Sequence, residues 1–207
     1  MSVKPSTPLN PWIKSTALEG QHVILEPLNL EHAEGLKLAT RDGELWKLWY
    51  TRIPAPDEVD AYIGHALESF DAGYALAFAV RDKESGEILG STRYCHVDAA
   101  NQRLEIGYTW YAARAQRTAV NTECKLLLWT QAFDVLNAID VEFRTHWHNQ
   151  ASRAAIARLG AKCDGVLRNH QRMADGTYRD TVVFSIINAE WPTVRKSLEF
   201  SLARSRG

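Results

Sequence analysis

The chain has 207 residues, of which 45% are hydrophobic and 24% charged; this is the composition of an ordinary globular domain and excludes collagen-like, disordered and disulfide-rich mini-protein classes. Its 24 Lys and Arg residues are balanced by 25 Asp and Glu residues, which argues against nucleic acid or another polyanion as the main partner. The length favours one domain with short additions, because a domain averages roughly 150 residues.

The cysteines and the first thirty residues indicate where in the cell the protein is expected. Cys95, Cys124 and Cys163 are far apart and odd in number, so they predict buried thiols and argue against a disulfide framework or a cysteine zinc site. No apolar run of secretory-signal length occurs near the start, and no stretch approaches the ~20 apolar residues of a membrane span. We therefore expect a cytoplasmic chain without a membrane partner.

The N-terminal third predicts an extended segment, one strand and two helices. Residues 1–19 contain several prolines and are expected to form an extended lead-in that packs Trp12 onto the body of the protein. Asn29 precedes apolar residues at helical spacing and is a candidate helix N-cap. The expected elements are a strand at 22–27, a helix after Asn29, a short helix or turn followed by a loop within 44–56, and a helix at 57–71.

The middle of the chain predicts strands joined by short turns, and then the strongest helix. Strands at 75–81, 87–97 and 102–111 have short connections, as in an antiparallel meander. A helix at 118–137 leads to a strand at 139–145 that alternates apolar and charged residues. The apolar face of that helix comprises Val120, Cys124, Leu127, Leu128, Ala132, Val135 and Leu136, and its remaining positions include Glu123, Lys125, Thr130 and Asp134.

The C-terminal part predicts a helix, a hairpin and a last helix. Residues 149–159 are helical and end at Gly160, where a left-handed residue is expected. Strands at 162–169 and 177–187 flank the turn sequence Ala-Asp-Gly at 174–176, and residues 189–203 form a terminal helix. The element order predicts an α+β fold with a central mixed, mostly antiparallel sheet, helices on both faces and one strand-helix-strand crossover.

Several reaction classes lack the spacing that they require. The chain has no P-loop and no G-x-G-x-x-G turn for a nucleotide, and no G-x-S-x-G or H-E-x-x-H motif of the common hydrolases. His146 and His148 lie on the same side of a predicted strand, but no further ligand cluster accompanies them. We therefore expect no metal.

The segment between the strand at 102–111 and the long helix is more informative. It carries Arg114 and Arg117 and small side chains in the first helical turn. Unpaired N–H groups and the positive end of the helix dipole gather at such a turn, so an anionic phosphate is a natural ligand. The alternative is an ordinary N-cap by Thr118 with solvated arginines, and this feature alone leaves both interpretations open.

The whole layout resembles the GNAT acyltransferase superfamily, and within it the RimJ/RimL-type ribosomal-protein N-acetyltransferases, over roughly residues 20–187. Residues 116–121 (QRTAVN) match its Q/R-x-x-G-x-G/A motif, with Ala119 and Asn121 in place of the usual glycine-type residues. The other matches are the E-I-G-Y strand at 104–110, the N-x-x-S and L-G-A helix at 149–161, and the final strand at 178–185. Residues 188–207 form a C-terminal helix outside the matched domain.

The resemblance implies transfer of an acetyl or other acyl group from acyl-CoA to a primary amine, on a protein N-terminus or a small molecule. It implies that Glu105 acts as a base, directly or through water, and that Ser152 assists the departing thiolate. Alternatively, Glu105 is a cross-strand partner of an arginine such as Arg93, and Ser152 supports a helix start. The implied CoA-contacting residues are Thr109, Trp110, Tyr111, Gln116, Arg117, Thr118, Ala119, Val120, Asn121, Thr122, Asn149, Ser152 and Arg153.

The acceptor site implied by the resemblance lies in the region between the first two helices, and the strand before Asn149 contributes to the same cleft. Its expected residues are Trp46, Trp49, Tyr50, Arg52, His146 and Trp147. Aromatic rings there suit an apolar or cationic amine, although they are equally explained as core beneath a long connection. A non-catalytic CoA-binding protein on the same fold is the alternative function, and a homodimer is a possible assembly.

Overall fold

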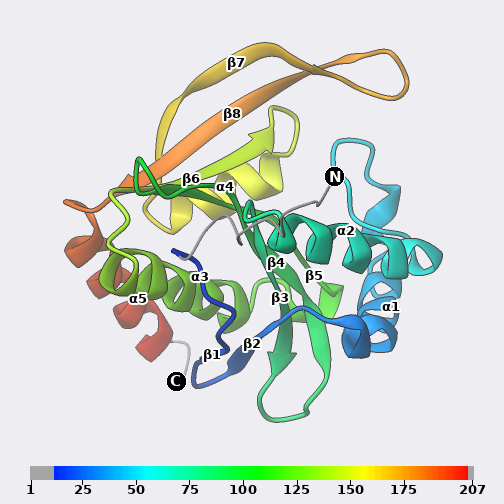
Figure 1. The fold of residues 1–207 in the computed structure, drawn as a ribbon, viewed down its shortest axis with the longest axis horizontal. Coiled ribbons are helices and arrows are strands. Elements are labelled where there is room, and N and C mark those ends of the chain that lie inside the picture. The colour runs from blue at the N-terminus through cyan, green and yellow to red at the C-terminus, as the bar shows by residue number, and fades with distance from the viewer. Residues whose placement is uncertain (1–11, 205–207) are drawn as a thin grey trace, which may run out of the picture.

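The computed structural model describes residues 12–204, whose strands form one eight-stranded sheet in the order β1-β2-β3-β4-β5-β6-β8-β7 (Figure 1). Only β5 and β6 pair in parallel, and every other neighbouring pair is antiparallel. The predicted mixed, mostly antiparallel sheet is therefore confirmed. The strands are β1 (Leu18–Glu19), β2 (Val23–Pro27), β3 (Leu76–Asp82), β4 (Ile88–Asp98), β5 (Arg103–Tyr111), β6 (Asp140–His146), β7 (Lys162–Arg172) and β8 (Tyr178–Ile187).

Helices cover both faces of the sheet, as predicted. On one face, α1 and α2 pack on Ala77, Ala79 and Ile88 of β3 and β4. On the other face, α3 and α5 pack on a larger core, and α4 lies against β6 and β8. The helices are α1 (Ala33–Arg41), α2 (Val59–Asp71), α3 (Ala119–Thr130), α4 (Gln150–Arg158) and α5 (Trp191–Arg204), with short helical turns at Leu30–His32, Leu45–Lys47, Pro56–Glu58 and Ala113–Ala115.

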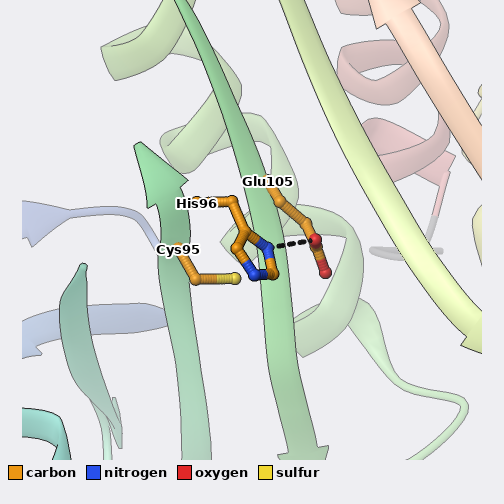
Figure 2. Close-up of side chains that lie close together, drawn as sticks. All are labelled: Cys95, His96 and Glu105. Atoms are coloured by element: carbon orange, nitrogen blue, oxygen red, sulfur yellow. Dashed lines mark hydrogen bonds and ion pairs between the residues drawn. The ribbon is translucent and has the colours of Figure 1, made fainter. Parts of the chain in front are cut away.

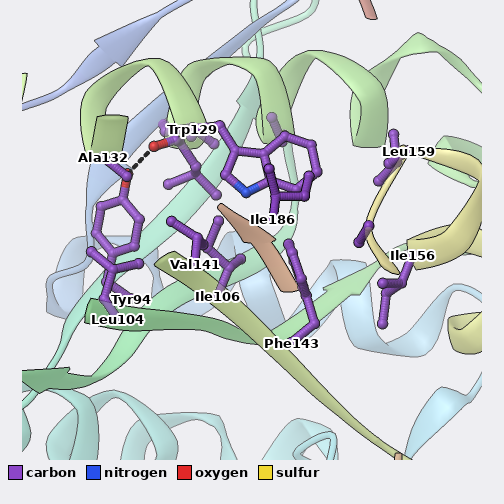
Figure 3. Close-up of a cluster of buried hydrophobic side chains, with 14 of the residues drawn as sticks. Tyr94, Leu104, Ile106, Trp129, Ala132, Val141, Phe143, Ile156, Leu159 and Ile186 are labelled. Carbon is purple, nitrogen blue, oxygen red and sulfur yellow. Dashed lines mark hydrogen bonds between the residues drawn. The ribbon is translucent and has the colours of Figure 1, made fainter. Parts of the chain in front are cut away.

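The larger core is centred on aromatic side chains between α3 and the sheet (Figure 3). Trp129 of α3 is fully buried and meets Phe143 of β6 edge to face at 5.5 Å between ring centroids. The hydroxyl of Tyr94 donates to the carbonyl of Leu128 in α3. Burial of rings of this size supplies much of the stability of such a core.

Local signals in the sequence are confirmed where turns begin and end helices. The side chain of Asn29 accepts from the Glu31 N–H at 2.9 Å and so caps the short helical turn before α1. Trp12, which was predicted to pack onto the body of the protein, donates to the carbonyl of Leu136 at 2.8 Å. Gly160 has φ of +102° after α4, a conformation that favours glycine. Residues 1–11 of the predicted lead-in and 205–207 of the predicted terminal helix lie outside the described residues.

The prediction for the long helix is partly wrong. Glu123 and Lys125, expected among the polar positions, are 5% and 3% exposed. After α3 the chain continues as a π-helix over Gln131–Val135, and the extra residue per turn rotates the following side chains. Val135 is for this reason 59% exposed and does not join the apolar face. Cys163, predicted to be buried, is also exposed on the edge strand β7.

The parallel pair β5 and β6 is short, and this shapes the site. Only Arg103 to Glu105 of β5 pair with Asp140 to Glu142 of β6. Beyond Glu105, β5 stays with β4, with a register shift between Ser91 and Arg93 and a left-handed Tyr108 at φ of +51°. The β5 edge that faces β6 therefore has no strand partner over residues 106–110. None of the helices described within residues 12–204 combines the length and the hydropathy that a membrane-spanning segment requires.

Candidate active site

A cavity of about 590 Å³ lies at the N-terminus of α3, where the sequence predicts a phosphate site. The side chain of Thr118 caps the helix by accepting from the Val120 N–H at 3.3 Å. Arg117 before it has φ of +61°. The cavity lining comprises Arg117, Thr118, Ala119, Thr122, Arg158, Ser201 and Leu202. Helix N–H groups and two guanidinium groups thus border one cavity, a combination that suits a phosphate.

The two arginines at this cavity are not the pair that the sequence indicates. Arg114 turns away and binds Asp42 at 3.0 Å and Glu87 at 3.1 Å. Arg158 of α4 takes its place and donates to the Thr122 hydroxyl at 3.3 Å. Its sequence position, 36 residues after Thr122, offered no signal of this contact. Gln116 donates to the carbonyl of Tyr111 at 3.1 Å and so holds the turn closed.

A buried lysine lies beneath the place where β5 and β6 separate. The ammonium of Lys125 is 2.9 Å from the Thr109 hydroxyl of β5 and 5.9 Å from the Phe143 ring centroid of β6. Burial lowers the pKa of Lys125 to about 8. Thr109 was predicted to contact CoA, whereas Lys125 was missed because its helical position indicates solvent. Trp110 and Tyr111, the next predicted residues, are buried and pair with β4.

Glu105 lies where the two strands begin to separate, and it is 6% exposed. Its carboxylate accepts a hydrogen bond from His96 Nδ1 at 2.8 Å and lies 3.6 Å from Arg144 Nε. The hydrogen bond to Glu105 raises the pKa of His96. Arg93, the predicted alternative partner, does not pair with Glu105; it stands opposite Gly107 in the register of β4 and β5.

Cys95, His96 and Glu105 point toward one another (Figure 2), and their ligand atoms lie within 4.8 Å of each other. Neighbouring strand residues usually face opposite sides of a sheet. A bulge in β4 after Cys95, with His96 at φ of +47°, turns both side chains toward Glu105. Burial raises the pKa of the Cys95 thiol well above its ordinary value. Thiol, imidazole and carboxylate are zinc ligands, and this trio is the candidate metal group within 12–204.

The predicted acceptor residues come together in part. Trp49, which is 58% exposed, meets Tyr50 at 5.5 Å and His146 at 5.1 Å between ring centroids. Trp49 is therefore not core, and the loop after α1 contacts the end of β6. Burial, with repulsion from Arg179 and His148, lowers the pKa of His146. That ring is neutral near pH 7, and its buried Nε2 has no hydrogen-bond partner within the described chain.

Other predicted site residues lie outside this aromatic cluster. Trp147 packs under the guanidinium of Arg153 at 4.3 Å, so Arg153, predicted to contact CoA, is engaged at the surface. Trp46 is close to Trp49 in the sequence and is half-buried. The ring contacts of the cluster join Trp49, Tyr50, His146 and His148 and do not include Trp46. Arg52 is exposed, and its charge helps to lower the pKa of Arg179, after the larger effect of burial.

Asn149 and Ser152 begin α4 close after β6. The side chain of Asn149 caps the helix by accepting from the Ser152 N–H at 3.0 Å, which is a structural role for this residue. The Ser152 side chain is half-buried. Three of the remaining predicted residues lie in the first turn of α3: Val120 and Thr122 are buried and Asn121 is half-buried. A contact of Val120 with a phosphate can therefore come only from its backbone.

Comparison with known proteins bears on this geometry. A family model described as an acetyltransferase (GNAT) domain matches residues 22–162. A GCN5-related N-acetyltransferase of known crystal structure from Brucella melitensis is 31% identical, with 93% of this chain and 87% of that chain covered and a TM-score of 0.82. The uncharacterized N-acetyltransferase p20 of Bacillus licheniformis is 27% identical over 176 residues, which cover 83% of this chain and 96% of p20.

A fold likeness extends to more distant proteins. RimJ of Mycobacterium smegmatis, solved in complex with CoA-disulfide, is 20% identical, with 88% of this chain and 90% of RimJ covered and a TM-score of 0.72. The structural neighbours thus include the RimJ type that the motifs at 104–110 and 149–161 indicate.

Proposed function

The chain belongs to the GNAT acetyltransferase family, and from that premise we propose that it transfers the acetyl group of acetyl-CoA, or another acyl group from its CoA thioester, to a primary amine. The observation that carries the proposal is the separation of β5 and β6 beyond Glu105. It leaves the edge of residues 106–110 that faces β6 without a strand partner, and the backbone groups of that edge can bind the pantetheine arm as an added strand. The cavity at the N-terminus of α3 suits the pyrophosphate at the other end of that arm.

In the proposed reaction, a neutral amine attacks the thioester carbonyl. The new C–N bond forms, the C–S bond breaks, the amine loses a proton and the departing thiolate gains one. An amine with a pKa of roughly 8 to 10 is mostly protonated at neutral pH, so a base must remove a proton. Glu105 is our proposed base, oriented by its hydrogen bond from His96. Ser152 is the proposed hydrogen-bond donor to the thiolate.

The proposed acceptor site is formed by Trp49 and Tyr50 with His146 at the end of β6. Arg52 and Trp46 on the same loop and Trp147 after β6 are retained in the proposal as its rim. The contact between Trp49 and His146 supports this assignment, because it joins the loop after α1 to the strand that borders the opening. Cytoplasmic action and a homodimer are part of the same proposal.

Turnover tests the proposed function directly. We expect the protein to release CoA thiol from acetyl-CoA when amines are supplied, after correction for its three cysteines. Release that depends on an amine supports the enzyme. Stabilisation against heat by CoA, without turnover of any amine in a broad panel, supports the alternative of a non-catalytic CoA-binding protein. The departures from the motif at Ala119 and Asn121 favour that alternative. Absence of any melting shift at millimolar acetyl-CoA contradicts both.

The variant Glu105→Gln is expected to lower kcat about 100-fold, which is typical for loss of a general base, and to leave KM for acetyl-CoA nearly unchanged. Residual turnover remains because holding two reactants together supplies much of the acceleration. Steady-state kinetics measures both constants. Glu142→Gln is the matched control, since Glu142 stands opposite Glu105 on β6 and also binds Arg144. An equal loss in both variants would show that the arginine pairing, and not a base, was disturbed.

A further inference from the structure

Arg93 of β4 is a buried cation without an anionic partner. It is 5% exposed, and its Nε is enclosed without a hydrogen bond. Its guanidinium carbon lies 4.4 Å from the ring centroid of Tyr108 and 5.3 Å from that of Tyr62. Within residues 12–204, no carboxylate or carbonyl binds this side chain, whereas Arg81 is paired with Glu26 at 2.8 Å.

Two aromatic rings do not offset the cost of burying this charge. A cation–π contact contributes about 0.5 to 2 kcal/mol. Removing a charged group from water costs several kcal/mol unless a counter-charge accompanies it. The arrangement of Arg93 between two tyrosines is therefore suited to an anion that arrives from outside the chain, and guanidinium binds carboxylate through two parallel hydrogen bonds.

The position of Arg93 connects this anion to the proposed chemistry. Arg93 and Cys95 are two residues apart on β4 and face the same side of the sheet, and Cys95 stands opposite Glu105. Two residues of strand span about 7 Å. This backbone spacing suits one small molecule with an anionic group at Arg93 and an amine at Glu105. Tyr108, which is 52% exposed, covers Arg93 from the neighbouring strand.

Further cations border the same region. Arg144 lies 3.6 Å from Glu105. Arg179 of β8 is half-buried, and its Nε donates to the Thr181 hydroxyl at 3.0 Å. Glu142, the nearest other carboxylate on β6, is already bound by Arg103 and Arg144. Arg144 is therefore engaged with carboxylates, whereas Arg93 and Arg179 bind no carboxylate within residues 12–204 and leave an excess of positive charge near Glu105.

We infer that the acceptor is a small amine that also carries a carboxylate, as a free amino acid does, and that Arg93 binds this carboxylate between Tyr62 and Tyr108. The inference rests on the proposed acetyl transfer and narrows its acceptor class. The same cations disfavour protonation of a nearby amine and so increase the neutral, nucleophilic form. Polycationic acceptors such as polyamines are repelled from this site.

The test compares the natural amino acids with their C-terminal amides, which keep the amine and the side chain but lack the carboxylate, and adds spermidine as a polycation. With the unmodified protein we expect kcat/KM for the best amino acid to exceed that for its amide by at least about tenfold, the lower range for a hydrogen bond to a charged group. Acetyl-CoA thiol release measures every arm of the panel.

Arg93→Gln should remove this preference. We expect KM for the amino acid to rise about 10- to 100-fold with a smaller change in kcat, while kcat/KM for the amide stays within about threefold, as expected when one charge-assisted interaction is lost. Arg93→Lys should keep part of the preference, since it retains the charge without the planar fork. Arg172→Gln on the exposed strand β7 is the control for charge alone, and a melting curve checks the fold of each variant.

The outcomes separate the two proposals. Thiol release with amides or spermidine, equal to or above that with amino acids, overturns the carboxylate inference and leaves the acetyltransferase standing. Loss of activity toward acids and amides alike in Arg93→Gln, with an unchanged melting curve, also overturns it. Failure of every amine to release thiol rejects the proposed function instead.

Discussion

Replacement of Glu123 by glutamine is expected to lower the free energy of unfolding by about 3 kcal/mol, within the range for disrupting a buried charged hydrogen-bond network. One carboxylate oxygen accepts from the N–H of Gln21 at 2.8 Å, and the other accepts from His22 at 2.7 Å and Val23 at 2.8 Å. Glutamine keeps one acceptor and turns its amide hydrogens toward at least one of these donors. Urea unfolding at pH 7 measures the change.

Glu199→Gln supplies the matched control, because Glu199 is exposed on α5 and such surface changes usually stay within about 0.5 kcal/mol. Gly20→Ala gives an independent check of the same contact, since a Cβ at Gly20 would lie 2.6 Å from the Glu123 carboxyl carbon. A loss below about 1 kcal/mol in Glu123→Gln would mean that water replaces the carboxylate. The contact joins α3 to the turn between β1 and β2, so it also steadies the helix whose N-terminus borders the phosphate cavity.

The second large effect depends on pH and concerns Lys125. Its pKa is about 8 in the native protein and 10.5 as the ordinary value. Between these two values the unfolded chain binds a proton that the native chain does not, so the free energy of unfolding rises with pH. Relative to Lys125→Met, the unmodified protein should gain about 3 kcal/mol between pH 7 and pH 10.5, at about 1.4 kcal/mol for each pKa unit.

Urea unfolding of both proteins at several pH values measures this difference, and groups shared by the two chains cancel from it. Below pH 8 the native protein carries the full cost of burying the ammonium. The free energy of unfolding of Lys125→Met, relative to that of the unmodified protein, is therefore expected to be highest near pH 7. Lys196→Met, on the exposed surface of α5, should show a difference that does not change with pH. A flat difference for Lys125→Met would mean that the ammonium is solvated or paired in solution.

Glu123 and Lys125 also show what the sequence could not predict. The periodicity of the segment 118–137 predicted the helix, and Asn29 and Gly160 predicted helix ends, because backbone hydrogen bonding and φ depend on near neighbours. Glu123 was placed among the polar positions, yet its partners are the N–H groups of residues about 100 positions earlier. No local pattern carries that information.

The candidate site divides in the same way. The match at 116–121 predicted the turn where the cavity lies, and the loop aromatics Trp49 and Tyr50 were predicted beside His146, which the ring contacts bear out. Arg158, and not the predicted Arg114, borders the cavity. His96 and Arg144, and not the predicted Arg93, lie beside Glu105. These exchanges depend on how a helix end and a strand bulge turn side chains that are remote in the chain.

Apart from the two-residue β1, the sequence by itself determined the order of strands and helices, the mixed sheet with one crossover and the family, because hydrophobic period, turn residues and short motifs are local properties of the chain. Only the tertiary structure decided which charges are buried and which are paired. It left Arg93 and Lys125 without carboxylate partners, because burial and pairing of a charge are set by the segments that the fold brings around it, in this protein by β4, β5 and α3.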